Sequence, residues 1–298
     1  MTVTLGSCFT GIESTPRISS GDVRKREAAE LTPEQKFLSE VVHEAPARWT
    51  AGKRFYVSDD KISIIFQPDA PEVSLTGKEL VFESIEDIPS VTGEGASVLT
   101  FAVDGVDDRF RYTVNIPRKK LLSRDRLEVP FTIESSLVST ISSMMKGNTY
   151  YISTPKWHQA SDSKAVTGRR HIPVIITRVL PGSYIYPLKV YFSPEGSDQE
   201  YWIPMTFGND RSATRNFDAL FHFENPRLRF PRISDEKWQM ITESRVVDGM
   251  TRDEARLALG APNSYRTIPV INAIVEEWSY DDGVYLIFED GILTRFRL

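Results

Sequence analysis

Apolar and polar residues alternate along most of the chain, and this pattern predicts β-strands. From Trp49 onward the apolar period is close to two, and Pro, Gly or Asp interrupts it about every ten residues. The predicted strands are 54–58, 62–66, 79–84, 97–103, 109–116, 126–133, 149–154, 172–179, 188–192 and 200–207. Residues 139–145 are ambiguous. So many short strands favour a sandwich or barrels and argue against an α/β fold with helical crossovers.

One helix is predicted ahead of these strands. Thr32 is a helix-capping residue, Pro33 suits the first helical position, and Gln35 completes a capping box. Apolar residues then recur at helical spacing, so the pattern predicts an amphipathic helix over 33–43.

The β region contains a weak internal repeat. Three stretches open with Gly and continue as an alternating strand: 52–57, 77–82 and 147–152. The spacing Phe101-x3-Gly105-x4-Phe110 also returns, as Phe192-x3-Gly196-x4-Tyr201. Duplication of one small β-barrel or sandwich unit, over 49–135 and 145–230, would explain the repeat. The alternative is that hairpins of similar length have converged on glycine turns.

The C-terminal segment has the clearest local signals. A short helix is predicted over 234–243, and Thr251 with Glu254 forms a second capping box, before a helix that ends at Gly260. Three strands follow, at 275–280, 284–288 and 293–297, joined by Asp-Gly turns. The pattern therefore predicts a compact α-α-β-β-β unit.

The predicted fold class is mainly β with a C-terminal α+β domain. Duplicated small β-barrel or sandwich units come first, and the α-α-β-β-β domain follows. The predicted divisions are 1–31 as a signal remnant and flexible tether, 32–135 as the N-terminal helix and first β unit, 136–232 as the second β unit, and 233–298 as the α+β domain.

Composition and charge narrow the class of protein. The 298 residues carry a formal net charge of -5, and 40% of them are hydrophobic. These values exclude collagen-like and wholly disordered chains, and the single cysteine excludes a disulfide scaffold. Mild acidity argues against nucleic-acid binding. No window approaches the roughly 18–20 apolar residues that a transmembrane helix needs.

The single cysteine, Cys8, lies in the sequence Leu-Gly-Ser-Cys, which resembles a bacterial lipobox. A linker rich in Ser, Thr, Gly and Pro follows it. A signal peptide needs a basic segment and an apolar segment before the cysteine, and neither is present. Either the start codon is placed too far downstream, or the chain has been trimmed, or the match is accidental and Cys8 is a free thiol. Lipidation of Cys8 would attach the protein to a membrane and place it in the cell envelope.

The C-terminal motifs are similar, in order and spacing, to those of the SmpA/OmlA family of bacterial outer-membrane lipoproteins. The matching residues are Gly249-Met250-Thr251-x-x-Glu254, Leu259-Gly260-x-Pro262, Trp278-x-Tyr280 and Leu286-x-Phe288-x-Asp290-Gly291-x-Leu293. The resemblance covers about residues 240–298. It implies an α-α-β-β-β fold and an envelope setting, and the family's best-known members are accessory subunits of the machinery that inserts outer-membrane β-barrel proteins.

Catalytic and metal-binding patterns are not found in the sequence. The four histidines, His43, His158, His171 and His222, lack metal-ligand spacing and are interpreted as scattered surface or capping residues. Paired acidic residues fall at predicted turns, and the basic pair Arg169-Arg170 is isolated. We therefore predict no catalytic residue, no metal and no cofactor.

Aromatic residues offer one possible binding surface. Neighbours on a strand face opposite ways, so either Tyr201 or Trp202 should face outward, and Trp157 lies on a nearby strand. The sequence predicts a lipid-anchored envelope protein with a non-catalytic protein-binding or scaffolding role, whose partner is another envelope protein. The alternative is a surface carbohydrate-binding lipoprotein that uses Trp157, Tyr201 and Trp202.

Overall fold

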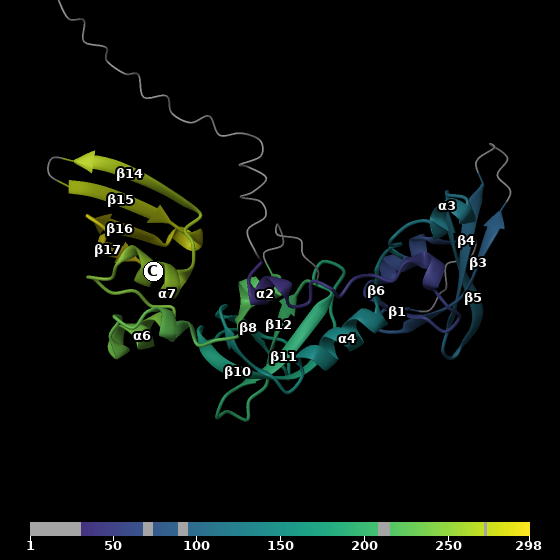
Figure 1. Cartoon of the computed structure of the whole chain (residues 1–298), viewed down its shortest axis with the longest axis horizontal. Coiled ribbons are helices and arrows are strands. Elements are labelled where there is room, and N and C mark those ends of the chain that lie inside the picture. The colour runs from purple at the N-terminus through teal and green to yellow at the C-terminus, as the bar shows by residue number, and fades with distance from the viewer. Residues whose placement is uncertain (1–30, 68–73, 89–94, 208–214, 271–272) are drawn as a thin grey trace, which may run out of the picture.

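The computed structural model describes residues 31–67, 74–88, 95–207, 215–270 and 273–298. These residues form three antiparallel sheets, which follow one another along the longest axis of the molecule (Figure 1). Each sheet has its own core of buried apolar side chains. The predicted fold class, mainly β with a C-terminal α+β unit, is confirmed.

The first sheet has the strand order β2-β5-β4-β3-β1-β6. Its strands are β1 (Arg54–Val57), β2 (Phe66–Gln67), β3 (Glu79–Ile88), β4 (Ala96–Val103), β5 (Val106–Val114) and β6 (Thr132–Glu134). The short helices η1 (Pro46–Arg48), η2 (Asp60–Ile64) and α3 (Arg118–Leu122) accompany it. Strict alternation buries Leu99, Phe101 and Val103 of β4 on one face of the sheet.

The second sheet has the order β13-β7-β10-β11-β12-β8-β9. Its strands are β7 (Thr149–Ile152), β8 (Lys156–Gln159), β9 (Ala165–Thr167), β10 (Ile172–Pro181), β11 (Leu188–Pro194), β12 (Tyr201–Met205) and β13 (Phe221–His222). Three helices accompany it: α2 (Pro33–Lys36), α4 (Ser135–Met145) and α5 (Phe217–Leu220). Helix α4 packs against β10, and α2 contacts α5.

The two sheets repeat one topology. When β1 is matched to β7, the pairs β2/β8, β3/β10, β4/β11, β5/β12 and β6/β13 fall into the same order, and β9 is an addition to the second sheet. Both sheets are open, whereas a closed barrel or a sandwich was expected for each unit.

The match extends to individual residues. Phe101 pairs with Phe110 as Phe192 pairs with Tyr201, and the register shift after Phe82 in the first sheet recurs after Ile176 in the second. The turn glycines of the two hairpins, Gly105 and Gly196, both have φ of 77°. Agreement in register, bulge and turn is what an internal duplication predicts, whereas convergence of single hairpins would not reproduce the strand order.

The C-terminal unit packs two helices on a third sheet. It contains η3 (Pro226–Arg229), α6 (Asp235–Thr242), α7 (Arg252–Leu259), β14 (Ser264–Val270), β15 (Ala273–Ser279), η4 (Asp281–Gly283), β16 (Tyr285–Glu289) and β17 (Ile292–Arg297). Both predicted helices and the three predicted strands are present. Strand β14 was not predicted. It is an edge strand whose residues, such as Tyr265 at 68% exposure, are mostly open to solvent, so it lacks the alternation of a half-buried strand.

Two predicted elements near the N-terminus are wrong. The helix over 33–43 ends at Lys36, because Leu38 has a left-handed φ of 64°, and its side chain is buried in the core of the second sheet. The segment that begins at α2 therefore packs with the second sheet, although it was grouped with the first. The strand over 62–66 is mostly η2, whose N-cap Asp59 accepts a hydrogen bond from the Lys61 amide.

Tertiary packing decides one segment that was predicted wrongly and one that was left ambiguous. The strand over 126–133 is reduced to β6, because Phe131 has a φ of 62° and interrupts the extended chain. The ambiguous 139–145 belongs to helix α4, which buries Leu137, Ile141 and Met145 at helical spacing.

Candidate functional site

A cleft of about 380 Å³ lies where the second sheet meets helix α7. Ser153 and Thr154 follow β7, Arg170 and His171 precede β10, and Arg215 precedes α5. The polar lining is completed by His222 of β13 and Arg256 of α7. The cleft thus combines residues from both sides of this junction.

The lining of the cleft is strongly basic. Among the residues that the structure describes, it includes Arg170, Arg215 and Arg256 but no aspartate or glutamate, and none of these arginines forms an ion pair. Burial lowers the pKa of Arg170 to about 10 and also lowers that of Arg215, and both guanidinium groups stay charged at neutral pH. In a chain whose net charge is -5, this is a local concentration of positive charge.

The end of helix α7 positions two of the basic side chains. The Leu257 carbonyl lies in the last turn, where carbonyl groups lack a partner within the helix. It accepts hydrogen bonds from Arg170 Nη1 at 3.2 Å and from His171 Nε2 at 3.0 Å. A cation at this position is also favoured by the helix dipole.

The tautomer of His171 follows from this contact. A carbonyl oxygen can only accept, so Nε2 carries the proton, and Nδ1 of the neutral ring is a hydrogen-bond acceptor. Burial lowers the pKa of His171 to about 4, which keeps the ring neutral at pH 7. The residue is 9% exposed, and its Nδ1 is buried with no hydrogen-bond partner among the described residues.

The internal repeat makes His171 unusual. Its counterpart in the first sheet is Gly77. The His171 amide donates to the carbonyl of Ile152, the last residue of β7, and the Gly77 amide donates in the same way to the carbonyl of Val57, the last residue of β1. Both residues have a left-handed φ, 58° for His171 and 85° for Gly77. Glycine adopts that conformation without cost, whereas a histidine there is strained. The second repeat therefore has a histidine at a position where the backbone conformation favours glycine.

Other polar atoms of the cleft also lack partners. Ser153 Oγ, Arg170 Nε and Arg215 Nη2 are buried and unbonded within the described part of the chain. The counterpart of Ser153 is Ser58, whose hydroxyl donates to the Phe131 carbonyl at 2.9 Å. Unpaired buried donors are costly unless a ligand or water binds to them. The three arginines that line the cleft suit an anion.

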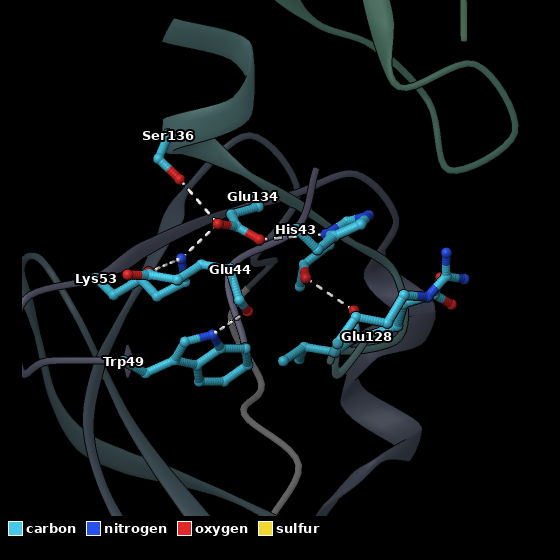
Figure 2. Close-up of polar contacts among 10 residues, drawn as sticks. His43, Glu44, Trp49, Lys53, Glu128, Glu134 and Ser136 are labelled. Carbon is cyan, nitrogen blue, oxygen red and sulfur yellow. Dashed lines mark hydrogen bonds and ion pairs between the residues drawn. The ribbon is translucent and has the colours of Figure 1, made fainter. Parts of the chain in front are cut away.

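A second buried polar cluster lies near β1 and β6 (Figure 2). Glu134 accepts hydrogen bonds from Lys53 and Ser136, and it lies 3.2 Å from Nδ1 of His43. Lys53 also donates to Glu44 at 2.7 Å. The Glu134 and Lys53 side chains are 3% and 6% exposed. Because these groups satisfy one another, we assign the cluster a structural role.

The aromatic residues that the sequence predicted as a binding surface are largely covered. Trp157 is 4% exposed and packs on Phe192 in the core, and half-buried Tyr201 lies on the same side, 5.2 Å from Trp157. Trp202 faces the other way, as alternation predicted, but it is only 9% exposed. His158 stacks on its ring at 4.3 Å, and Lys189 lies over it at 4.9 Å. The expected exposed aromatic strip is therefore not formed by these residues.

Three further sequence-based predictions concern Cys8, the histidines and the Arg169-Arg170 pair. Cys8 lies outside the described residues. The four histidines were interpreted as scattered, yet the structure brings the rings of His171 and His222 to 6.4 Å from each other. Arg170 of the supposedly isolated Arg169-Arg170 pair belongs to the cleft as well. The signal that could have found this site is the alignment of the two repeats, which places His171 opposite Gly77.

Comparisons with known proteins add no relative. No protein-family model, curated protein or solved structure matches the chain. None of the helices in the described residues is long and apolar enough to cross a membrane. Nor does the described part contain a group of three or more His, Cys, Asp or Glu residues placed to hold a metal ion.

Proposed function

We propose that the protein is a non-catalytic binding protein of the bacterial cell envelope, and that the basic cleft holds an anionic group of its ligand or partner. The observation that carries the proposal is the lining of the cleft, with three arginines and no carboxylate among the described residues. Guanidinium groups bind carboxylate and phosphate oxygens with well-directed, charge-assisted hydrogen bonds.

Binding is favoured over catalysis by the state of the cleft's polar groups. A serine nucleophile needs a neighbouring base within hydrogen-bond reach. Ser153 Oγ has no hydrogen-bond partner in the described chain, and the proton on His171 Nε2 is directed at a backbone carbonyl. The arrangement offers donors to a ligand but does not activate a nucleophile.

The envelope setting is proposed from the sequence. The lipobox-like segment at Cys8 and the SmpA/OmlA-like motifs point independently to that compartment. In this proposal the lipidated Cys8 anchors the protein at the outer membrane, on its periplasmic face or at the cell surface, and another envelope protein is the partner. The covered rings of Trp157 and Trp202 disfavour the carbohydrate alternative.

Titration of the full chain with small anions tests the binding proposal. We expect saturable binding of inorganic phosphate by calorimetry, weakened about tenfold or more by Arg215→Gln, since each charge-assisted contact is worth about 1.5–3 kcal/mol. Arg178→Gln is the matched control, because Arg178 is exposed and already paired with Glu200. Equal binding by both variants, or no saturable binding of any small anion, would contradict the proposal.

The envelope part of the proposal needs a separate test. Mass spectrometry of the natively expressed protein should find a lipid on Cys8, and affinity capture from solubilised envelopes should recover a specific partner. An unmodified Cys8 thiol in that product would refute lipid anchoring without affecting the assignment of the cleft.

A further inference from the structure

The basic cleft lies between two units that have separate cores. Within the described chain, the core of the second sheet and the core of the C-terminal unit share no residue. Every hydrogen bond that the described residues form between these two units is donated by the segment Arg169–His171. The acceptors are Thr242, the last residue of α6, and Leu257, in the last turn of α7. Units joined by a small polar interface are expected to move relative to each other, so the position of the C-terminal unit depends on these few contacts.

The positive charges of the cleft come from both units. Arg170 and Arg215 belong to the unit of the second sheet, and Arg256 belongs to α7. Burial raises the pKa of Tyr280 to about 12, and the charges of Arg256 and Arg170 oppose that rise, so both guanidinium groups lie near the same phenol. Like charges on the two sides of the cleft repel each other and disfavour the contact between the units. An anion bound between them attracts both sides.

We propose that the anion held in the cleft bridges the two units: its oxygen atoms contact Arg256 on one side and Arg170 or Arg215 on the other, and its binding fixes the C-terminal unit on the second sheet. The inference rests on the proposed function of the cleft and adds how ligand binding is coupled to the position of the C-terminal unit.

The cleft also restricts the class of anion. Three arginines are better neutralised by two or more negative charges than by one. The cleft volume of about 380 Å³ falls within the range of about 300–1,000 Å³ that is typical of small-molecule sites. The ligand is therefore a small oxyanion with at least two negative charges, of which hydrogen phosphate is the simplest.

Hydrogen exchange of two neighbouring amides separates the junction from the sheet. The Arg170 amide donates to the Thr242 carbonyl, across the junction, whereas the His171 amide donates to the Ile152 carbonyl within the second sheet. A ligand that binds only the joined form slows exchange through the separated form by the factor 1 + [L]/Kd. With phosphate at about ten times its Kd and constant ionic strength, we expect the Arg170 amide to exchange about tenfold more slowly. Exchange of the His171 amide should change by less than about threefold, because its hydrogen bond does not cross the junction.

The variant Arg256→Gln removes the charge that the C-terminal unit contributes to the cleft. It should bind phosphate about tenfold more weakly or worse, since it loses a charge-assisted contact. At phosphate about ten times the variant's own Kd, exchange of the Arg170 amide should slow by less than about threefold, because the anion no longer holds both units. Arg266→Gln is the matched control in the same unit, because the Arg266 side chain is 68% exposed and pairs with Glu277. It should bind phosphate and respond to it as the unmodified chain does.

The outcomes distinguish this inference from the proposed function. If Arg256→Gln binds phosphate as tightly as the unmodified chain, or if phosphate binds without slowing exchange of the Arg170 amide, the bridge is refuted and the proposed function stands. Equal slowing of the Arg170 and His171 amides would also refute it, since the ligand would then stabilise the second sheet as a whole. Acetate, with a single charge, should bind at least about tenfold more weakly than phosphate at pH 8, and equal affinity would contradict the need for two charges. If no small anion binds, the proposed function fails.

Discussion

Replacing Glu134 with glutamine should destabilise the first sheet, because it leaves the buried ammonium of Lys53 without its main counter-ion. The substituted amide keeps the size of the side chain and its contact with Ser136, so the change tests charge and not packing. Removing one partner of a buried ion pair costs about 3–5 kcal/mol. Glu44 still lies 2.7 Å from Lys53 Nζ and is 41% exposed, so we expect the lower end of that range.

Hydrogen exchange is the suitable assay, because three separate cores make a single unfolding free energy ill-defined. A loss of about 3 kcal/mol corresponds to roughly 150-fold faster exchange of the protected amides in β1 and β6. Glu83→Gln is the matched control, since Glu83 pairs with Arg109 at the surface and such pairs contribute at most about 1 kcal/mol. Equal exchange in the two variants would refute the structural role of the cluster.

The same cluster predicts an acid dependence. Burial on its own raises the pKa of Glu134, but hydrogen bonds from His43 and Lys53, the charge of Lys53 and the Ser136 hydroxyl together lower it below the usual 4.5. The unfolded state therefore takes up this proton first. The stabilisation is fully present above about pH 4.5 and is lost as the pH falls further. Glu134→Gln should show less acid destabilisation than the unmodified chain below that pH.

Three further changes give local predictions. His171 has a folded-state pKa of about 4 against 6.5 normally, so the unfolded state is protonated first and the stability of the second sheet should fall by up to about 2 kcal/mol between pH 6.5 and 5. His171→Gly should flatten that slope, measured by hydrogen exchange of the β10 amides corrected for the intrinsic rate, and an unchanged slope would contradict the burial argument. Gly168→Ala would place a Cβ 2.1 Å from the ring of Trp157, so exchange of the protected amides in β8 should quicken by an amount corresponding to about 3 kcal/mol. Unchanged exchange would mean that the ring can move. Thr251→Ala removes the capping box with Glu254 and should cost about 1 kcal/mol by exchange of the α7 amides, with Thr251→Ser as the variant that retains it.

Elements specified by local chemistry could be predicted from the sequence. The capping box of Thr251 and Glu254 forms as expected at α7. The turn at Asp290 and Gly291, both with positive φ, joins β16 to β17 in the way that an Asp-Gly pair favours. In these cases the signal lies within a few residues, and the tertiary structure agrees with it.

Elements decided by distant partners could not be predicted. Helix α4 is rich in serine and β-branched residues, and it is stabilised by the apolar side chains that it buries against the second sheet. Leu38 leaves its helix because its side chain is buried in that same core. The cleft is harder still to predict, since Ser153, Arg170, Arg215 and Arg256 come from four separate segments and form no local motif.

The duplication shows which positions of the second sheet have diverged to line the cleft. Equivalent backbone hydrogen bonds and strand registers align the two repeats residue by residue. In this alignment the basic residues of the second repeat replace smaller or apolar ones of the first: Arg170 replaces Thr76, His171 replaces Gly77 and His222 replaces Ile133. In the second repeat these positions lie against the end of helix α7, whose Leu257 carbonyl orients two of the three side chains. A purely structural role would favour the small or apolar residues of the first repeat, which avoid both strain and unpaired buried polar atoms. Divergence toward basic and strained residues at a junction is the pattern expected where one copy of a repeat acquires a ligand and the other remains structural.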